Sequence, residues 1–311
     1  MIKLLTTSDF SQLTGRSIDD VDTVLRRCRI SELRYRELQP EELAKLEARV
    51  EDVITSEDLR KSGSNDPTVW ERGWGEIAAS LKDRQIAPEV LRPQYFRGEP
   101  TCRLFGRYIR PLVAEFEYDV GLALRQIFFY QFLRSVDAAV EFGCGTGINL
   151  LLLSAQMPQT RLIGCDWTKA SCQILEQMAR QTGHSIKGHL FNMLNAEGWA
   201  GDTIDRNTAV FTVHAMEQLG TQWRPFADYL LAKRPALCLH VEPLWELYDD
   251  TSLFDDRARR YHLKRGYLRG FCPFIGDLAR AGRAEILTLR RIAFGGLFHE
   301  AYSILAWRPT N

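Results

Sequence analysis

The sequence predicts an α/β fold: a doubly wound, seven-stranded, mostly parallel sheet with an antiparallel final hairpin, preceded by a helical N-terminal region. From about residue 117 onward, short apolar runs alternate with helical patterns, and this alternation is typical of βαβ units in a parallel sheet. The last two apolar runs break the alternation. Only a short loop around Gly295 and Gly296 separates them, so we expect them to pair antiparallel.

The apolar runs predict seven strands, at residues 138–142, 161–166, 186–192, 209–214, 237–241, 285–294 and 302–307. Helical patterns lie between the early strands, at residues 148–156, 169–181 and 223–232. Parallel strands connected in this way are expected to have right-handed crossovers.

Residues 1–116 have a different texture, which predicts helix and loop. Leu43, Leu46 and Val50 recur at helical spacing, with Pro40 at the helix entrance. We see no alternating strand pattern in this region. We therefore expect a helical N-terminal region that acts as a lid, a substrate-binding part or a dimerisation surface.

Four aromatic side chains follow in the same region, at Trp70, Trp74, Tyr95 and Phe96. They could form a lid over a substrate, although such residues more often belong to the core. The remainder, residues 117–311, is expected to be the ligand-binding domain, with residues 244–283 as a segment that covers the substrate.

Composition excludes several classes of function. Lysine plus arginine number 40, and aspartate plus glutamate also number 40, so there is no global field for nucleic acid or membrane. The seven cysteines show no C-x-x-C pair, and those in apolar runs, Cys144, Cys165 and Cys238, suit a reducing compartment. We see no signal peptide and no membrane span, and we expect a cytoplasmic protein.

A glycine-rich run follows the first predicted strand: Val140-Glu141-Phe142-Gly143-Cys144-Gly145-Thr146-Gly147. Glycines between a strand and a helix let the backbone approach a ligand closely, and ligands of open α/β sheets bind at the carboxyl ends of strands. The spacing is G-x-G-x-G, whereas a nicotinamide dinucleotide site has G-x-G-x-x-G, and a phosphate-binding loop would need G-K-[ST].

This run resembles the first motif of the class I S-adenosylmethionine (SAM)-dependent methyltransferases, and so does the predicted sheet, because the seventh strand of that family inserts antiparallel between the fifth and sixth. The resemblance covers roughly residues 117–311. It implies that Glu141 positions the charged amino-acid end of SAM, and that Gly143, Gly145 and Gly147 face its methionine and ribose parts.

The resemblance implies further cofactor contacts on the next strands. Asp166, at the end of the second strand, would accept hydrogen bonds from both ribose hydroxyls, and Trp167 would lie against the adenine. Asn192 would bond the adenine amino group in place of the family's usual acidic residue, with Asn195 as an alternative. The remaining expected cofactor contacts are Cys144, Met193 and Val213.

Three histidines fall at predicted strand ends on one edge of the sheet. They are His214, His240 and His299. A histidine base suits a hydroxyl acceptor, whose proton must be removed during methyl transfer. We prefer His214 or His299 as the base, with Glu242 or Glu300 as the group that orients it. Each histidine could instead only satisfy backbone groups near a strand end.

The acceptor is predicted only as a small molecule, methylated on oxygen or nitrogen. The cations and tyrosines of residues 257–269 could hold an anionic acceptor or could form a solvated helix face. After the fourth strand, His214-Ala215-Met216-Glu217 differs from the [DNS]-P-P-[YFW] tetrapeptide of nitrogen-methylating DNA and protein enzymes.

Alternative functions remain open at the level of the sequence. One is a non-catalytic scaffold that binds SAM, and a less favoured one is a nicotinamide-dependent oxidoreductase. No ligand spacing for a metal is recognisable, and we predict none. A homodimer is compatible with the sequence.

Overall fold

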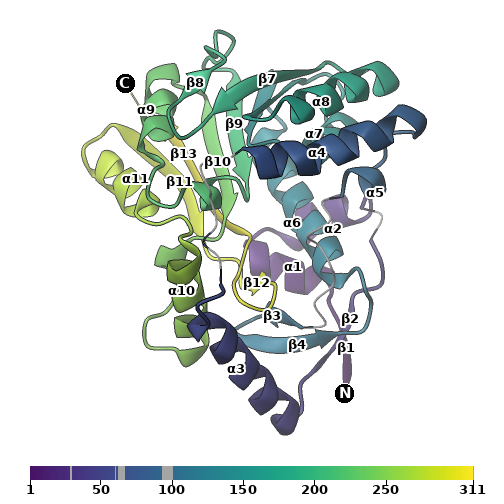
Figure 1. The fold of residues 1–311 in the computed structure, drawn as a ribbon, viewed down its shortest axis with the longest axis vertical. Helices are drawn as coiled ribbons and strands as arrows, with labels where there is room; N and C mark the ends of the chain where they lie inside the picture. The colour runs from purple at the N-terminus through teal and green to yellow at the C-terminus, as the bar shows by residue number, and fades with distance from the viewer. Residues whose placement is uncertain (29, 60, 62–66, 93–100, 311) are drawn as a thin grey trace.

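The computed structural model describes residues 1–28, 30–59, 61, 67–92 and 101–310 of the chain (Figure 1). Its centre is an eight-stranded sheet. In spatial order the strands are β11 (Ala284–Arg290), β13 (Ser303–Pro309), β10 (Leu237–Glu242), β9 (Thr208–Val213), β5 (Ala138–Phe142), β6 (Arg161–Asp166), β7 (Ile186–Asn192) and β8 (Glu197–Gly198).

The direction of these strands confirms the predicted fold class. Strands β10, β9, β5, β6 and β7 are parallel to one another. Strand β13 lies antiparallel between β10 and β11, which is the inserted seventh strand expected from the sequence. The two-residue β8 adds an eighth strand by pairing antiparallel with β7; it is too short to give a signal in the sequence.

Helices cover both faces of this sheet. The α-helices of the described residues are α1 (Thr7–Thr14), α2 (Ile18–Leu25), α3 (Pro40–Thr55), α4 (Thr68–Ser80), α5 (Pro88–Leu91), α6 (Phe116–Leu133), α7 (Ile148–Gln156), α8 (Lys169–Thr182), α9 (Arg224–Lys233), α10 (Leu253–Arg265) and α11 (Phe271–Arg280). Three short 3₁₀ helices are η1 (Leu81–Asp83), η2 (Met216–Leu219) and η3 (Trp245–Leu247). Helices α6, α7 and α8 lie on one side of the sheet, and α9 and α11 on the other (Figure 1).

Alternate residues of the strands supply the two cores. In β5, Ala139 packs in the core that contains α6, α7 and α8, whereas Val140 and Phe142 pack in the core with α9 and α11. Successive side chains of a strand point to opposite faces, so a strand with helices on both sides must be apolar at every position. This explains why the predicted strands read as continuous apolar runs.

The N-terminal region also contains strands, which the sequence did not predict. A second sheet has the order β1 (Ile2–Leu4), β2 (Arg34–Glu37), β4 (Arg107–Pro111), β3 (Cys102–Leu104) and β12 (Phe294–Gly295). All of its pairs are antiparallel. The expectation of a region made only of helix and loop is therefore wrong, because strands of three to five residues are too short for an alternating pattern to be recognised.

Strand β12 corrects the predicted hairpin. Strands β11 and β13 do pair antiparallel, but the chain between them is not a tight turn around Gly295 and Gly296. It leaves the large sheet after Arg290 and pairs Phe294 with Leu104 of the N-terminal sheet. The connection thus joins the two sheets. Among the described residues, no helix combines the length and the apolar character needed to cross a membrane.

Candidate cofactor and acceptor site

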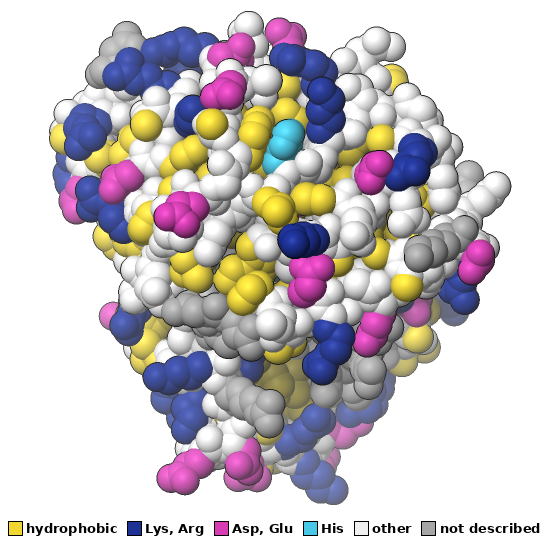
Figure 2. All heavy atoms as spheres, turned by 45° about the horizontal axis from the view of Figure 1, so that its top comes forward, with side chains coloured by type: hydrophobic (Ala, Val, Ile, Leu, Met, Phe, Trp, Pro, Cys, Tyr) yellow, Lys and Arg dark blue, Asp and Glu magenta, His cyan; other side chains and the backbone are white. Residues whose placement is uncertain are grey.

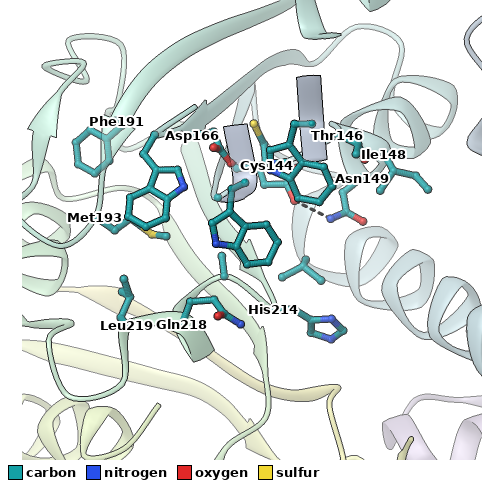
Figure 3. A pocket seen from close by; sticks show the side chains of 18 of the residues that line it. Cys144, Thr146, Ile148, Asn149, Asp166, Phe191, Met193, His214, Gln218 and Leu219 are labelled. Atoms are coloured by element: carbon teal, nitrogen blue, oxygen red, sulfur yellow. Dashed lines mark hydrogen bonds between the residues drawn. The ribbon is translucent and has the colours of Figure 1, made fainter. Parts of the chain in front are cut away.

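A cavity opens at the carboxyl ends of β5, β6, β7 and β9, where an open α/β sheet is expected to bind its ligand (Figure 3). It encloses about 1110 Å³ of space, its open mouth included. The residues that line it are Trp70, Trp74, Tyr118, Arg125, Glu141, Gly143, Cys144, Gly145, Thr146, Ile148, Asn149, Asp166, Trp167, Phe191, Asn192, Met193, Leu194, Val213, His214, Ala215, Gln218 and Leu219. All the residues predicted to bind a cofactor are among them except Gly147, which begins the adjoining helix α7.

The glycine loop has a backbone that favours glycine. Gly143 has φ of 73° and Gly145 has φ of 51°, both in the left-handed region that side chains with a Cβ avoid. A Cβ on Gly143 would also lie 2.4 Å from the Cβ of Ala215. The loop can therefore run close under the cavity floor.

Asp166 ties the second strand to this loop. Its Oδ2 accepts a hydrogen bond from the Gly145 amide at 2.9 Å, and its Oδ1 accepts from the amide and the hydroxyl of Thr168 at 3.0 and 2.7 Å. Burial raises the pKa of Asp166 and outweighs these hydrogen bonds. A carboxylate offers about four acceptor positions, so Asp166 keeps capacity for a ligand although it also holds the turn before α8.

A row of three buried polar side chains lies beside the loop. Asn149 donates to Oε1 of Glu141 at 2.6 Å and accepts from Nη1 of Arg125 at 2.8 Å. The second oxygen of Glu141, Oε2, and the second terminal nitrogen of Arg125, Nη2, are buried without a partner among the described residues. Burial raises the pKa of Glu141 to about 8. Unpaired polar groups are costly to bury, so this row is suited to a ligand with a cation and an anion.

Arg125 was not predicted from the sequence. It is 5% exposed and lies within α6, in the otherwise mostly apolar stretch Gly-Leu-Ala-Leu-Arg-Gln-Ile-Phe-Phe. A single cation in a helix that is buried all round is rarely tolerated without a partner. An isolated arginine in this apolar stretch is thus a sequence signal for a buried polar site.

His214 is the one predicted catalytic histidine that lines the cavity (Figure 3). Its φ of 54° is unusual for a residue with a side chain. Its ring is hydrogen-bonded to the main chain of Ala301, whereas Nε2 is buried without a partner in the described structure. Burial, reinforced by the charge of Arg125, lowers the pKa of His214 to about 3. The ring is thus neutral at ordinary pH and offers an unused acceptor.

His240 lies elsewhere, in the core of the sheet. Its Nδ1 is bonded to the hydroxyl of Thr212 at 3.0 Å, its Nε2 accepts from the indole of Trp307 at 3.1 Å, and its ring packs against Phe271 of α11. Both ring nitrogens are therefore used, and the ring lies on the face of the sheet that α11 covers. The expectation that His240 reaches the mouth of the cavity is wrong. His240 lies within β10 and not at its end, and its side chain points to the α11 face of the sheet because successive side chains of a strand alternate between the two faces.

His299 is also displaced from the cavity. Its Nδ1 lies 3.1 Å from Nε2 of His262, and its ring packs against Tyr261 and Tyr267. The cause is the long connection between β11 and β13, which carries His299 toward α10 instead of leaving it at the strand end. Glu300, proposed as an orienting group, is bonded to Arg291.

Glu242 does not contact a histidine in the manner expected of an orienting group. Its Oε1 accepts from the amides of Ala215 and Met216, both at 3.1 Å, and its Oε2 accepts from the amide of Glu217 at 3.2 Å. Glu242 therefore caps the 3₁₀ turn η2 that follows His214. Burial raises the pKa of Glu242 to about 7.

Of the two residues expected at the adenine, Asn192 lines the cavity and Asn195 does not. Asn192 lines the cavity, and its Oδ1 accepts a hydrogen bond from the Leu194 amide at 2.9 Å, which leaves that oxygen a second acceptor position. The alternative, Asn195, is exposed and donates to Glu197, and it does not line the cavity.

The basic segment at residues 257–269 does not line the cavity either. Arg257 bonds Glu47 of α3 at 2.8 Å, and Arg260 bonds Glu51 of α3. Arg259 lies over the ring of Trp245 at 4.6 Å. Arg257 and Arg260 thus hold α10 against α3, and these cations do not supply the charge expected for an anionic acceptor in the cavity.

No protein-family model matches the chain, and no curated protein matches it. Among solved structures, a SAM-dependent methyltransferase from Aquifex aeolicus is 12% identical, over 60% of this chain and 89% of that one, with a TM-score of 0.43. The geranyl diphosphate C-methyltransferase of Streptomyces coelicolor is 11% identical, over 78% and 98%, with a TM-score of 0.43. The small RNA methyltransferase HEN1 is 15% identical, over 66% of this chain and 28% of that one, with a TM-score of 0.46.

The class of fold is taken from the strand order and not from these similarities. Five parallel strands in the order β10-β9-β5-β6-β7, with an antiparallel strand inserted between β10 and the edge strand β11, form the arrangement to which the glycine run also pointed. The chain has the class I SAM-dependent methyltransferase fold.

Proposed function

We propose that this chain transfers a methyl group from SAM to a small-molecule acceptor. The observation that carries the proposal is the pair of unpartnered buried atoms, Oε2 of Glu141 and Nη2 of Arg125, in the same cavity as the glycine loop and Asp166. The α-ammonium and α-carboxylate of the cofactor supply the charges that this pair lacks. A nicotinamide dinucleotide would bring a pyrophosphate to the loop and leave both atoms without partners.

The other end of the cofactor is held by residues of the next two strands. Asp166, which already accepts three hydrogen bonds and keeps about one acceptor position, accepts a ribose hydroxyl where the family resemblance implies both, and Trp167 and Met193 lie against the adenine. Asn192 takes the place of the usual acidic residue at the adenine amino group. Cys144 and Val213 complete the walls, and Gly147 starts the helix beneath them.

The cofactor supplies an electrophilic methyl group on a sulfonium, and the protein's main task is to align an acceptor with it. His214 accepts a hydrogen bond from the acceptor's O–H or N–H through Nε2, while the bond to Ala301 fixes its ring. A pKa of about 3 makes His214 a weak base, so it orients the acceptor more than it removes the proton before transfer. Neither His240 nor His299 has a part in this proposal, and Glu242 acts by holding the turn after His214.

The remaining walls suit a planar, largely uncharged acceptor. Beyond the cofactor residues, the cavity is lined by Trp70 and Trp74, which also lie over the glycine loop, and by Tyr118, Gln218 and Leu219. Aromatic walls with few polar groups are typical of small-molecule sites. Basic and acidic side chains are interspersed over the face drawn in Figure 2, which favours a small molecule over a polyanion such as RNA.

The test is a crystal structure with S-adenosylhomocysteine. We expect its amino-acid end against Glu141 and Arg125, and its sulfur on the same side as His214. If the sulfur lies farther from Nε2 of His214 than a single bridging water can span, the proposed role of His214 is ruled out. Binding without methyl transfer to any aromatic acceptor would favour the scaffold alternative.

A further inference from the structure

Helix α4 of the N-terminal region covers the glycine loop. Its residues Trp70 and Trp74 line the cavity, and carbons of the Trp74 ring lie 3.2 and 3.4 Å from the point where a Gly145 Cβ would be. Since the glycine loop is where the proposed cofactor is expected to lie, the two indoles would cover the cofactor from outside.

One carboxylate fastens α4 in this position. The two oxygens of Glu71 accept hydrogen bonds from the amides of Lys169 at 2.7 Å and Ala170 at 3.1 Å. These amides belong to the first turn of α8, whose own N-cap residue, Thr168, makes no side-chain cap bond because its hydroxyl is bonded to Asp166. The first turn of α8 is thus capped from another helix, and a carboxylate at a helix N-terminus is favourable.

Helix α4 has a residue of low helix propensity on each side of Trp74. Gly73 and Gly75 flank Trp74 within α4, and neither has a positive φ. A Cβ at either position would meet nothing within 4 Å, so neither packing nor a turn requires glycine here. Each glycine makes helix formation about fivefold less favourable than alanine does.

We propose that α4 is a gate, which unwinds at Gly73 and Gly75 to admit and release the cofactor and is held shut by Glu71. This inference rests on the proposed function, because it takes SAM as the ligand of the cavity. Glu71 is a positioning residue: it acts on the cofactor through Trp70 and Trp74. The glycines set how often the gate opens, and the carboxylate sets how firmly it closes.

The glycines give the sharper test. Wild-type protein is loaded with S-adenosylhomocysteine, and the dissociation rate is followed by tryptophan fluorescence after displacement with excess SAM. We expect dissociation to slow about fivefold in Gly73→Ala or Gly75→Ala and about 20-fold in the double variant, in proportion to the helix propensity gained. The control is Glu76→Ala, an exposed position on the same helix, which should leave the rate unchanged.

Glu71 gives the opposite change. Glu71→Ala should speed dissociation about tenfold or more, the value of a charge-assisted hydrogen bond, and Glu71→Gln should restore part of the wild-type rate because its amide oxygen still accepts one bond. A merely structural role would lower the melting temperature without changing the dissociation rate.

The possible failures can be told apart. A double glycine variant that releases S-adenosylhomocysteine at the wild-type rate would show that α4 does not unwind, and the gate would be rejected while the methyltransferase proposal stands. Wild-type protein that binds no S-adenosylhomocysteine would reject the cofactor itself, and the gate with it.

Discussion

The most informative single residues are Glu141 and Arg125, each with one buried polar atom that has no partner among the described residues. Glu141 lies on the strand before the glycine loop and Arg125 on the helix before that strand, and Asn149 links them. A buried charge with an empty bonding position is costly unless a ligand completes it. These residues therefore identify the amino-acid end of the site more specifically than the glycines do.

Replacing Arg125 tests this directly. Arg125→Met removes the cation and keeps much of the apolar stem, so we expect binding of S-adenosylhomocysteine to weaken about tenfold or more, the value of a charge-assisted hydrogen bond. 5′-Methylthioadenosine lacks the amino-acid end, and its affinity should not change. Calorimetric titration of both ligands measures the difference, and equal losses for the two would refute a specific contact.

The pH dependence of binding follows from Glu141, whose pKa burial raises to about 8. The cofactor's ammonium favours the carboxylate, so the bound pKa lies below the free one, and binding releases a proton at pH values between the two. Affinity for S-adenosylhomocysteine should therefore rise as pH increases from 6 to 8 and level off above 8. Titration in buffers of different ionisation enthalpy measures the proton released, and a flat profile would contradict this assignment.

At the scale of elements, the strands and helices of the sheet could be predicted, but the connections could not. Strand β5 and the helix after it begin and end where the apolar pattern placed them, because helices on both faces force every strand position to be apolar. The displacement of His299 could not be predicted, because β12 pairs with β3, almost 200 residues away. Sequence patterns report local periodicity, and they do not report which distant backbone completes a two-residue strand.

Two glycine-to-alanine changes test how tightly β12 joins the two sheets. A Cβ on Gly295 would lie 2.2 Å from the carbonyl oxygen of His299 and 2.6 Å from the Cα of Glu300, both backbone atoms that cannot rotate away. We expect Gly295→Ala to lower the free energy of unfolding by about 1–3 kcal/mol. Gly276, in the middle of α11, would meet only the end of Arg280 at 3.5 Å.

Gly276→Ala should accordingly be neutral or stabilise the chain by up to about 1 kcal/mol. Urea titration of both variants beside the wild type gives the comparison. Equal effects of the two substitutions would mean that the backbone around β12 relaxes freely and does not hold the sheets together.

At the scale of the whole molecule, the large sheet and helix α4 of the N-terminal region share one cavity. The large sheet supplies the glycine loop, Asp166 and His214, and the N-terminal region supplies the indoles of α4. The sequence predicted the first contribution, because glycine spacing is a local signal. Whether Trp70 and Trp74 are core or lid could not be decided from the sequence, since it depends on the packing of α4 along α8. Tyr95 and Phe96, considered with them, lie outside the described residues.

The measurement that bears most directly on the proposed function is the thermal stability of the chain with S-adenosylhomocysteine and with NAD⁺. At 100 times its dissociation constant, S-adenosylhomocysteine should stabilise the wild type by about 2.7 kcal/mol, a rise in melting temperature of about 4 °C for a chain of this size, and Asp166→Ala should weaken its binding at least tenfold. NAD⁺ should have no effect. A rise with NAD⁺ and none with S-adenosylhomocysteine would contradict the assignment of a SAM-dependent methyltransferase.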